Sequence, residues 1–355
     1  MDIIQALTQE LQVEKWQIEA AVKLIDEGNT IPFISRYRKE ATGSLNDEIL
    51  RNLHERLLYL RNLEDKKKQV LSSIEEQGKL TEELKKSILE AQTLVVVEDL
   101  YRPYRPKRRT RATIAKEKGL EPLANLILLQ MTDKSIEEEA ESYVSEEKEV
   151  KNVKEAIAGA SDILAESVAD EADYRIRIRN MTVKSGSVVS SAKKENEKSV
   201  YEMYYDYEER IKYIKPHRVL AINRGEKEQV LSVSITVDND YIISYLENKI
   251  IKQDNVDSTA IVKNAILDSY KRLILPSIER EVRSELKEVS EEAAIEVFGD
   301  NLENLILTPP MKDITVLGFD PAYRTGCKLA VVDQTGKVLK IDKVFITIPK
   351  DNYDK

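Results

Sequence analysis

The chain has 355 residues, of which 41% are hydrophobic and 34% charged, and its formal net charge at pH 7 is −9. The length is typical of about two or three domains, and the hydrophobic fraction is sufficient for packed cores. No apolar run approaches the ~20 residues of a membrane span. The net negative charge argues against a protein that coats nucleic acid over its whole surface, but it is compatible with a local basic groove.

The first hundred residues predict helices. Apolar residues recur at spacings of three and four over Ile3–Leu11, and a second helix ends at Gly28, which suits a left-handed cap. Ser44 with Asp47 resembles a capping box that starts a long helix rich in leucine. A further helix opens at Thr81, and the two form a predicted αα-hairpin.

Residues 102–111, here called the basic arm, contain two prolines and six basic residues without an acid. Proline removes backbone donors and opposes helix, so we expect an extended basic loop. Arginine and lysine contact phosphates, and tyrosine stacks on unpaired bases. The candidate nucleic-acid-binding residues are Arg102, Tyr104, Arg105, Lys107, Arg108, Arg109 and Arg111. The alternative is that these arginines pair with carboxylates of adjacent helices.

The middle of the chain mixes helical and extended patterns. A helical pattern returns from about residue 120 to 178, with a turn or a close-packing point expected at Gly159–Ser161. Val183–Lys198 predicts a loop or a weak hairpin. Val230–Val237 predicts a strand, and Tyr241–Leu246 predicts either its hairpin partner or a helix.

A long helical pattern runs from Ser258 to Phe298, and Pro276 should kink or break it. Beyond it, Thr315–Phe319 and Leu329–Val332 predict strands of a β-meander that opens an α/β domain. Because a meander of this size is marginal alone, we expect the natural protein to continue beyond the last residue given.

Asp320 ends an apolar strand, which is the layout of the first carboxylate of an RNase H-like nuclease. That chemistry needs several carboxylates around two metal ions, so we interpret Asp320 as a vestigial candidate and expect no complete active site, metal or cofactor. Asp333 is expected in a turn. His54, His217 and Cys327 do not form a zinc set, and the chain contains no phosphate-binding glycine loop.

Arg36–Lys39 forms a smaller basic and aromatic cluster, which a solvated helix end explains more simply than nucleic-acid binding. The single cysteine and the lack of an apolar leader at the N-terminus predict a cytoplasmic protein.

Four segments resemble the bacterial Tex family in the same order along the chain. They are Thr30–Gly43, Glu98–Ala115, His217–Lys227 and Leu317–Lys328. The resemblance implies a role in transcription and nucleic-acid binding, with a helical N-terminal region that includes a helix-turn-helix part and then a YqgF domain of RNase H-like fold. It also implies that the family's helix-hairpin-helix motifs and OB-fold RNA-binding domain are not among these residues, and that the family is not an active nuclease.

The sequence therefore predicts a mainly α protein with a helix-turn-helix part and a long helix, followed by the first strands of a truncated RNase H-like α/β domain. The expected parts are an N-terminal helical region (1–119), a helix-turn-helix-like region (120–200), a central region with a short hairpin and the long helix (201–310) and the start of the YqgF domain (311–355). We expect a nucleic-acid-binding transcription accessory protein that is not an enzyme, with RNA or DNA and the transcription machinery as partners. The alternatives are a metal-dependent nuclease or resolvase, and a protein-docking scaffold.

Overall fold

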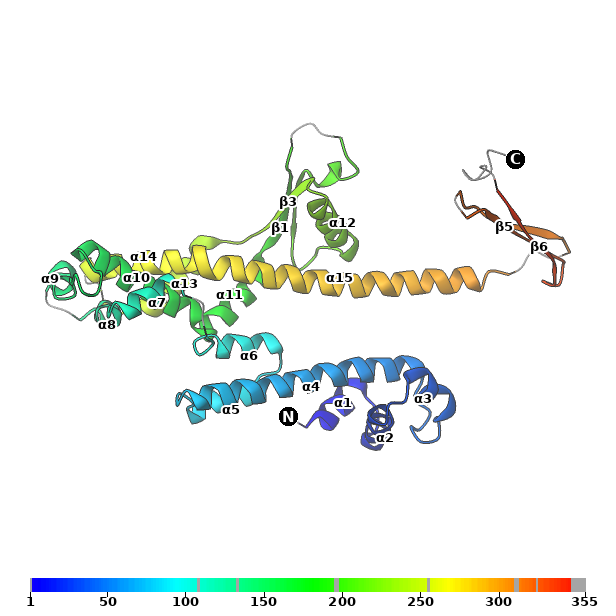
Figure 1. The fold of residues 1–355 in the computed structure, drawn as a ribbon, viewed down its shortest axis with the longest axis horizontal. Helices are drawn as coiled ribbons and strands as arrows, with labels where there is room; N and C mark the ends of the chain where they lie inside the picture. Colours follow the sequence, from blue (N-terminus) through cyan, green and yellow to red (C-terminus); the bar gives the residue numbers. More distant parts are fainter. Residues whose placement is uncertain are drawn as a thin grey trace, which may run out of the picture. The chain divides into compact units, whose positions relative to one another are not determined.

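The computed structural model describes residues 2–106, 109–131, 134–194, 198–253, 256–309, 313–323 and 325–345. It forms two compact units, Met1–Ser290 and Glu291–Lys355. Helices dominate, and two three-stranded antiparallel sheets accompany them, so the mainly α fold is confirmed (Figure 1). The four-part division and the helix-turn-helix part stay predictions. Within the described ranges, no helix is both long and apolar enough to cross a membrane.

The first unit opens with helices that share one long partner. They are α1 (Ile3–Leu11), α2 (Lys15–Asp26), α3 (Ile31–Tyr37), α4 (Asp47–Glu76), α5 (Glu82–Glu90) and α6 (Leu94–Tyr101). The first half of α4 buries Leu50, Leu53 and Leu57 against α1 to α3. Its second half buries Val70 and Ile74 against α5 and α6. One leucine-rich stripe therefore serves two cores.

Side-chain hydrogen bonds show which residues cap these helices. Thr81 is the N-cap of α5, as predicted, and accepts from the Leu84 amide at 3.2 Å. The predicted cap of α4 is wrong by two residues: Asn46 accepts from the Ile49 amide at 2.8 Å. Ser44 instead has a φ of +62°, in the left-handed region where a residue cannot serve as an extended N-cap.

The next helices pack around α10. They are α7 (Arg111–Glu117), α8 (Glu121–Leu129), α9 (Ile136–Glu141), α10 (Val153–Asp170) and α11 (Ala172–Ser185). Gly159 lies inside α10, so the turn expected there is wrong and the close-packing alternative is correct. A β-carbon at Gly159 would lie 2.4 Å from Cδ1 of Leu120.

A small sheet follows, with the order β2-β1-β3 and antiparallel neighbours. Its strands are β1 (Ser187–Ala192), β2 (Asp206–Arg210) and β3 (Leu231–Thr236), with the short 3₁₀ turn Glu202–Tyr204 before β2 and helix α12 (Pro216–Lys227) before β3. The central strand β1 lies where a loop or weak hairpin was expected. The strand at Val230–Val237 is confirmed.

The hairpin partner expected at Tyr241–Leu246 is wrong, because these residues lie in helix α13 (Asn239–Ile250). Asp238 caps α13 by accepting from the Tyr241 amide at 3.0 Å. Ile242 and Leu246, four residues apart, are both buried on one face of the helix.

The long helical pattern is not broken at Pro276, although a break was one of the two expectations; a π turn precedes the proline instead. Helix α14 (Val256–Asp268) continues through a π turn (Ser269–Ile274) into α15 (Leu275–Ile306). Pro276 has no amide hydrogen and its ring crowds the carbonyl four residues back. The π turn accommodates this change, since the Leu275 amide donates to the Tyr270 carbonyl, five residues back.

The second unit contains a meander of β4 (Val316–Asp320), β5 (Cys327–Val332) and β6 (Val338–Val344), in the order β4-β5-β6. This confirms the predicted strands. The predicted turn at Asp333 is also confirmed, since its carboxylate accepts from the Thr335 amide at 2.8 Å and the Lys337 amide at 3.0 Å.

Candidate nucleic-acid interface

The basic arm joins α6 to α7. An extended loop was expected here, but this is wrong for its first residues, which continue in helical turns. The Tyr104 and Arg105 amides donate to the Tyr101 carbonyl at 2.9 and 3.0 Å. Both bonds close turns around Pro103, which has no amide hydrogen of its own. Thr110 then caps α7 and accepts from the Thr113 amide at 3.1 Å. Of the predicted site residues, Lys107 and Arg108 lie outside the described residues.

Arg102 is partly buried beside Asp170. Its Nε lies 3.4 Å from Oδ1 of Asp170, and its side chain is 35% exposed. Burial lowers the pKa of the Arg102 guanidinium, and the charge of nearby Arg175 adds to this effect. We therefore expect Arg102 to hold α6 against α10 rather than to contact a phosphate.

The three other described arginines of the arm point outward. Arg105 lies 3.9 Å from Glu98, Arg109 lies 3.4 Å from Glu117, and Arg111 lies 4.0 Å from Asp162, measured between charged nitrogen and oxygen. Their side chains are 67%, 73% and 67% exposed. Exposed pairs of this kind contribute at most about 1 kcal/mol, so a phosphate can replace the carboxylate as partner.

Tyr104, the predicted stacking residue, is half-buried. It packs against the core formed by α4 to α6, and its carbonyl accepts from Nε2 of Gln77 at 2.9 Å. Tyr101 is held in the same way, with its hydroxyl 2.9 Å from Oγ of Ser73. Only part of the Tyr104 ring is therefore open to a base.

Two clefts flank the arm, and both have walls of mixed charge. The first, of about 790 Å³, is lined by Lys79, Arg105 and Lys116 together with four carboxylates, those of Glu76, Glu166, Asp170 and Glu171. The second, of about 600 Å³, is lined by four arginines (Arg102, Arg105, Arg111 and Arg272) and three carboxylates (Asp162, Glu166 and Asp170). The carboxylates on these walls repel a polyanion. The outer faces of the arginines therefore suit phosphate better than the cleft interiors.

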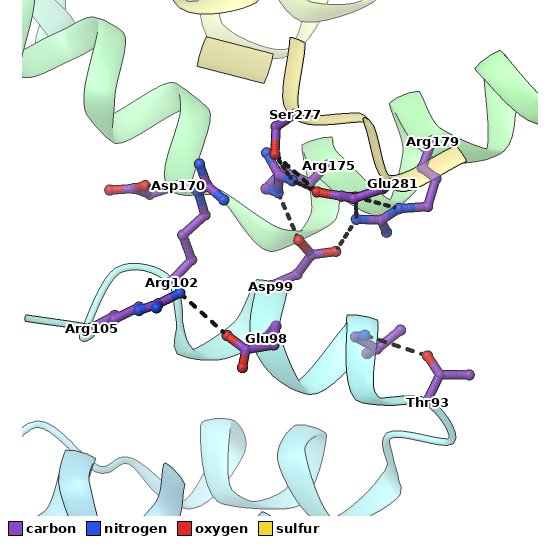
Figure 2. A network of polar contacts seen from close by, with 11 residues as sticks. Thr93, Glu98, Asp99, Arg102, Arg105, Asp170, Arg175, Arg179, Ser277 and Glu281 are labelled. Carbon is purple, nitrogen blue, oxygen red and sulfur yellow. Dashed lines mark hydrogen bonds and ion pairs between the residues drawn. The ribbon is translucent and has the colours of Figure 1, made fainter. Parts of the chain in front are cut away.

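A buried network of charges positions α6, the helix that precedes the arm (Figure 2). Arg175 on α11 donates to Asp99 on α6 at 2.7 Å and to Glu281 on α15 at 2.6 Å. Arg179 lies 2.8 Å from the second oxygen of Asp99 and 2.6 Å from Glu281. Ser277 bonds both Arg175 and Glu281. Two guanidinium groups and two carboxylates thus join three helices.

The smaller cluster at Arg36–Lys39 occupies the end of α3 and the residues after it. The Arg38 guanidinium lies 5.4 Å from the centre of the Phe33 ring, and Tyr37 is exposed. The cluster was expected to be a solvated helix end rather than a nucleic-acid site, and its position at the end of α3 is compatible with that interpretation. No role was predicted for the cations of 210–217, which the structure places on an exposed turn between β2 and α12.

The nuclease candidate Asp320 lies at the end of β4. Its side chain is 71% exposed, and its nearest described cation is Lys328, at 4.0 Å. Among the described residues, no group of three or more His, Cys, Asp or Glu side chains is placed to hold a metal ion.

Three family descriptions match the chain in order. The Tex-like protein N-terminal domain matches residues 1–75, the Tex central region-like domain matches 132–298, and the Tex protein YqgF-like domain matches 314–355. The chain belongs to the Tex family. The basic arm falls between the first two Tex matches, whereas the turn at 210–217 falls inside the second.

Relatives of the Tex family align over nearly the whole chain. Protein YdcI of Bacillus subtilis is 51% identical over 97% of this chain and 48% of its own length. Transcriptional accessory protein Tex of Neisseria gonorrhoeae is 40% identical over 99% of this chain and 47% of its own length. The human S1 RNA-binding domain-containing protein 1 is 33% identical over 97% of this chain and 36% of its own length. The chain therefore spans about half the length of its bacterial relatives or less.

Proposed function

We propose that this chain is a nucleic-acid-binding part of a Tex-type transcription accessory protein, with RNA or DNA as its partner and the transcription machinery as its protein partner. Membership of the Tex family supports the transcription role, since one relative is named a transcriptional accessory protein and another an S1 RNA-binding domain-containing protein. The observation that carries the binding role is the exposure of Arg105, Arg109 and Arg111 on one short segment.

The geometry supports phosphate contact through exchange of partners. Each of the three arginines has a carboxylate at 3.4 to 4.0 Å, near the outer limit of an ion pair, and most of each side chain is in solvent. An incoming phosphate therefore replaces a weak contact rather than a buried bond.

A salt titration tests this function. Fluorescence anisotropy would follow binding of labelled single-stranded and duplex oligonucleotides between about 50 and 200 mM salt. Replacing Arg105, Arg109 and Arg111 by alanine should make the slope of log K against log salt shallower by about 2.1 for single strands and about 2.7 for duplex, at 0.7 to 0.9 per contact. An unchanged slope would remove the arm from the binding surface.

A matched control removes the same charge elsewhere. Arg51 and Arg61 on α4 and Arg224 on α12 have side chains that are 63%, 40% and 75% exposed, and each forms an ion pair with a carboxylate. Their triple alanine variant loses three positive charges, so any general effect of net charge appears there too. The proposal requires a clear difference between the two triple variants.

The proposal assigns no catalytic role to Asp320. Incubation of the chain with Mg²⁺ and single-stranded or branched DNA should give no cleavage. Cleavage that disappears in Asp320→Asn would instead support the nuclease hypothesis, because a metal ligand loses its charge in that variant while its shape is kept.

A further inference from the structure

Residues 210–217, here called the basic turn, run from the last residue of β2 into the first turn of α12 and carry Arg210, Lys212 and Lys215 with no acid among them. All three side chains are exposed. Within the part of the chain that the structure describes, none of the three forms an ion pair. This distinguishes the basic turn from the basic arm, where each described arginine has a carboxylate partner.

The turn is held by groups other than its cations. The Ile211 amide donates to the Gly186 carbonyl at 3.0 Å, and the Tyr213 and Ile214 amides donate to the Arg210 carbonyl at 2.9 and 3.0 Å. The Ile211 side chain is buried. Because backbone bonds and one apolar side chain hold the turn, its cations project from a fixed backbone and are not needed for folding.

The nearest carboxylate on the same strand, Glu209, is bound chiefly by Arg218 and Tyr207, and the charge of Lys215 also interacts with it. Glu209 accepts two hydrogen bonds from Arg218, at 2.9 and 2.8 Å, and a third from the Tyr207 hydroxyl. Glu208, two residues before Arg210 and about 7 Å along the strand, is exposed and opposes the positive field. The turn thus keeps a local excess of positive charge beside two exposed acids of β2, Glu208 and the more distant Asp206.

Other charges surround the same end of the sheet. Asp238 and Asp240 follow β3, two strand spacings or about 10 Å from β2, a distance close to the Debye length in the cell. Lys184 lies two residues before Gly186, whose carbonyl anchors the turn, and it adds a further exposed cation. Screening weakens the effect of the distant acids more than that of the turn's own cations.

An aromatic ring stands among these cations. Tyr213 is 61% exposed, and Nζ of Lys212 lies 5.7 Å from the centre of its ring. Cations beside an exposed ring are the combination that binds single strands, since the cations contact phosphates and the ring stacks on an unpaired base. A duplex hides its bases, and a membrane surface needs a wider apolar face than a single tyrosine supplies.

We propose that the basic turn is a binding surface for single-stranded nucleic acid, in which Arg210, Lys212 and Lys215 contact phosphates and Tyr213 stacks on a base. This assignment rests on the nucleic-acid-binding function proposed above but places it on a second surface. Within the described ranges, Arg210 and Lys212 have no ion pair to release, and Lys215 interacts with Glu209 without forming an ion pair. We therefore expect the turn to contribute more affinity per contact than the arm.

Anisotropy measurements on the full 355-residue chain test the assignment. The probes are labelled dT and U oligomers of about 12 nucleotides and a matched duplex. Lys212→Ala/Lys215→Ala should weaken single-strand binding about 25-fold at 0.1 M salt and make the slope shallower by about 1.4, since each contact contributes about 0.7 to the slope and hence about fivefold. Tyr213→Ala should weaken binding about 5- to 150-fold, and Tyr213→Phe should not.

A double variant with the same charge loss is the control. Lys85→Ala/Lys263→Ala removes two exposed lysines from α5 and α14. The assignment is overturned if this control weakens binding as much as the turn variant. It is also overturned if poly-glutamate displaces the oligomer at equal charge concentration, which would identify an acidic peptide as the ligand.

Two further measurements separate the possible failures. If a turn variant has an altered circular dichroism spectrum, acetylation of the unmodified chain replaces it: bound oligomer should protect Lys212 and Lys215 but not Lys85, and equal labelling overturns the assignment. Loss of binding only in the arm triple variant overturns this inference and leaves the proposed function. A wild-type chain that binds no oligomer refutes both.

Discussion

The buried charge network gives the sharpest stability prediction. Asp99→Asn keeps the shape of the side chain but leaves Arg175 and Arg179 with one carboxylate, Glu281, between them. Arg175 is completely buried and Asp99 is 4% exposed, so water cannot replace the lost charge. We expect Asp99→Asn to lower the free energy of unfolding of the first unit by about 3–5 kcal/mol.

The magnitude follows from distance and dielectric. Two unit charges about 4 Å apart interact by about 4 kcal/mol at an effective dielectric constant of 20 and by about 1 kcal/mol in water. The same substitution at Asp26 provides the control. Asp26 forms two hydrogen bonds with Arg61 at 2.7 and 2.8 Å, but the two side chains are 47% and 40% exposed. Asp26→Asn should therefore cost at most about 1 kcal/mol.

Urea unfolding followed by circular dichroism measures both variants, with the two compact units treated as separate transitions. The reasoning is refuted if Asp99→Asn costs no more than Asp26→Asn. The pH dependence gives a second check. Burial opposes ionisation of Glu281, but the hydrogen bond from Arg179 and the charges of Arg175 and Arg179 outweigh it and hold its pKa below the ordinary value. The stability that ionised Glu281 contributes is fully present above the ordinary pKa of a glutamate and is lost as pH falls through the lowered pKa. Glu281→Gln should therefore make the free energy of unfolding depend less on pH in acid.

Three further predictions concern single positions. Gly186→Ala should destabilise the first unit by about 1–3 kcal/mol in urea unfolding, because a β-carbon there would lie 2.5 Å from the Thr182 carbonyl oxygen. Gly299→Ala is the control: a β-carbon there would meet open space, so this change should stabilise its helix by up to about 1 kcal/mol. Burial and the hydrogen bond to Glu209 raise the pKa of Tyr207 to about 12. The stability that the neutral Tyr207 hydroxyl contributes is therefore present below the ordinary pKa of 10.0 and is lost as pH rises toward 12. Tyr207→Phe should remove this loss of stability at high pH in thermal melts. Lys67→Met should cost about 1–3 kcal/mol, because the buried ammonium donates to the Leu89 carbonyl at 2.9 Å; stability equal to wild type would contradict this.

Local patterns in the sequence predicted the elements whose structure depends on their own residues. The apolar spacing of Ile3–Leu11 gave α1, the missing donor of Pro276 gave the interruption of the long helix, and the apolar runs after residue 314 gave the meander. Each depends on interactions within about one helical turn or one strand, which a sequence displays directly.

The errors arose where two local solutions compete or where a distant partner decides. Asn46 and Ser44 are both good cap residues, and backbone conformation selected Asn46. Tyr241–Leu246 suits a strand or a helix, and the cap at Asp238 with packing of one face selected the helix. The partners of Arg175 lie 76 and 106 residues away, so no local pattern could reveal which arginines are buried.

The difference between local patterns and distant partners also decides how a basic segment should be interpreted. A run of arginines predicts positive potential only if the fold leaves it unpaired, and the arm shows that pairing can be nearly complete and still weak. Binding at Arg105, Arg109 and Arg111 must first release three exposed ion pairs, which at about 0.2–1 kcal/mol each lowers affinity by about 3- to 160-fold relative to free cations. Among the residues that the structure describes, Lys212 has no such ion pair to release, and Lys215 interacts with Glu209 without forming an ion pair. Three basic residues on a turn held by its backbone can therefore equal a longer arginine-rich arm as a site for a polyanion.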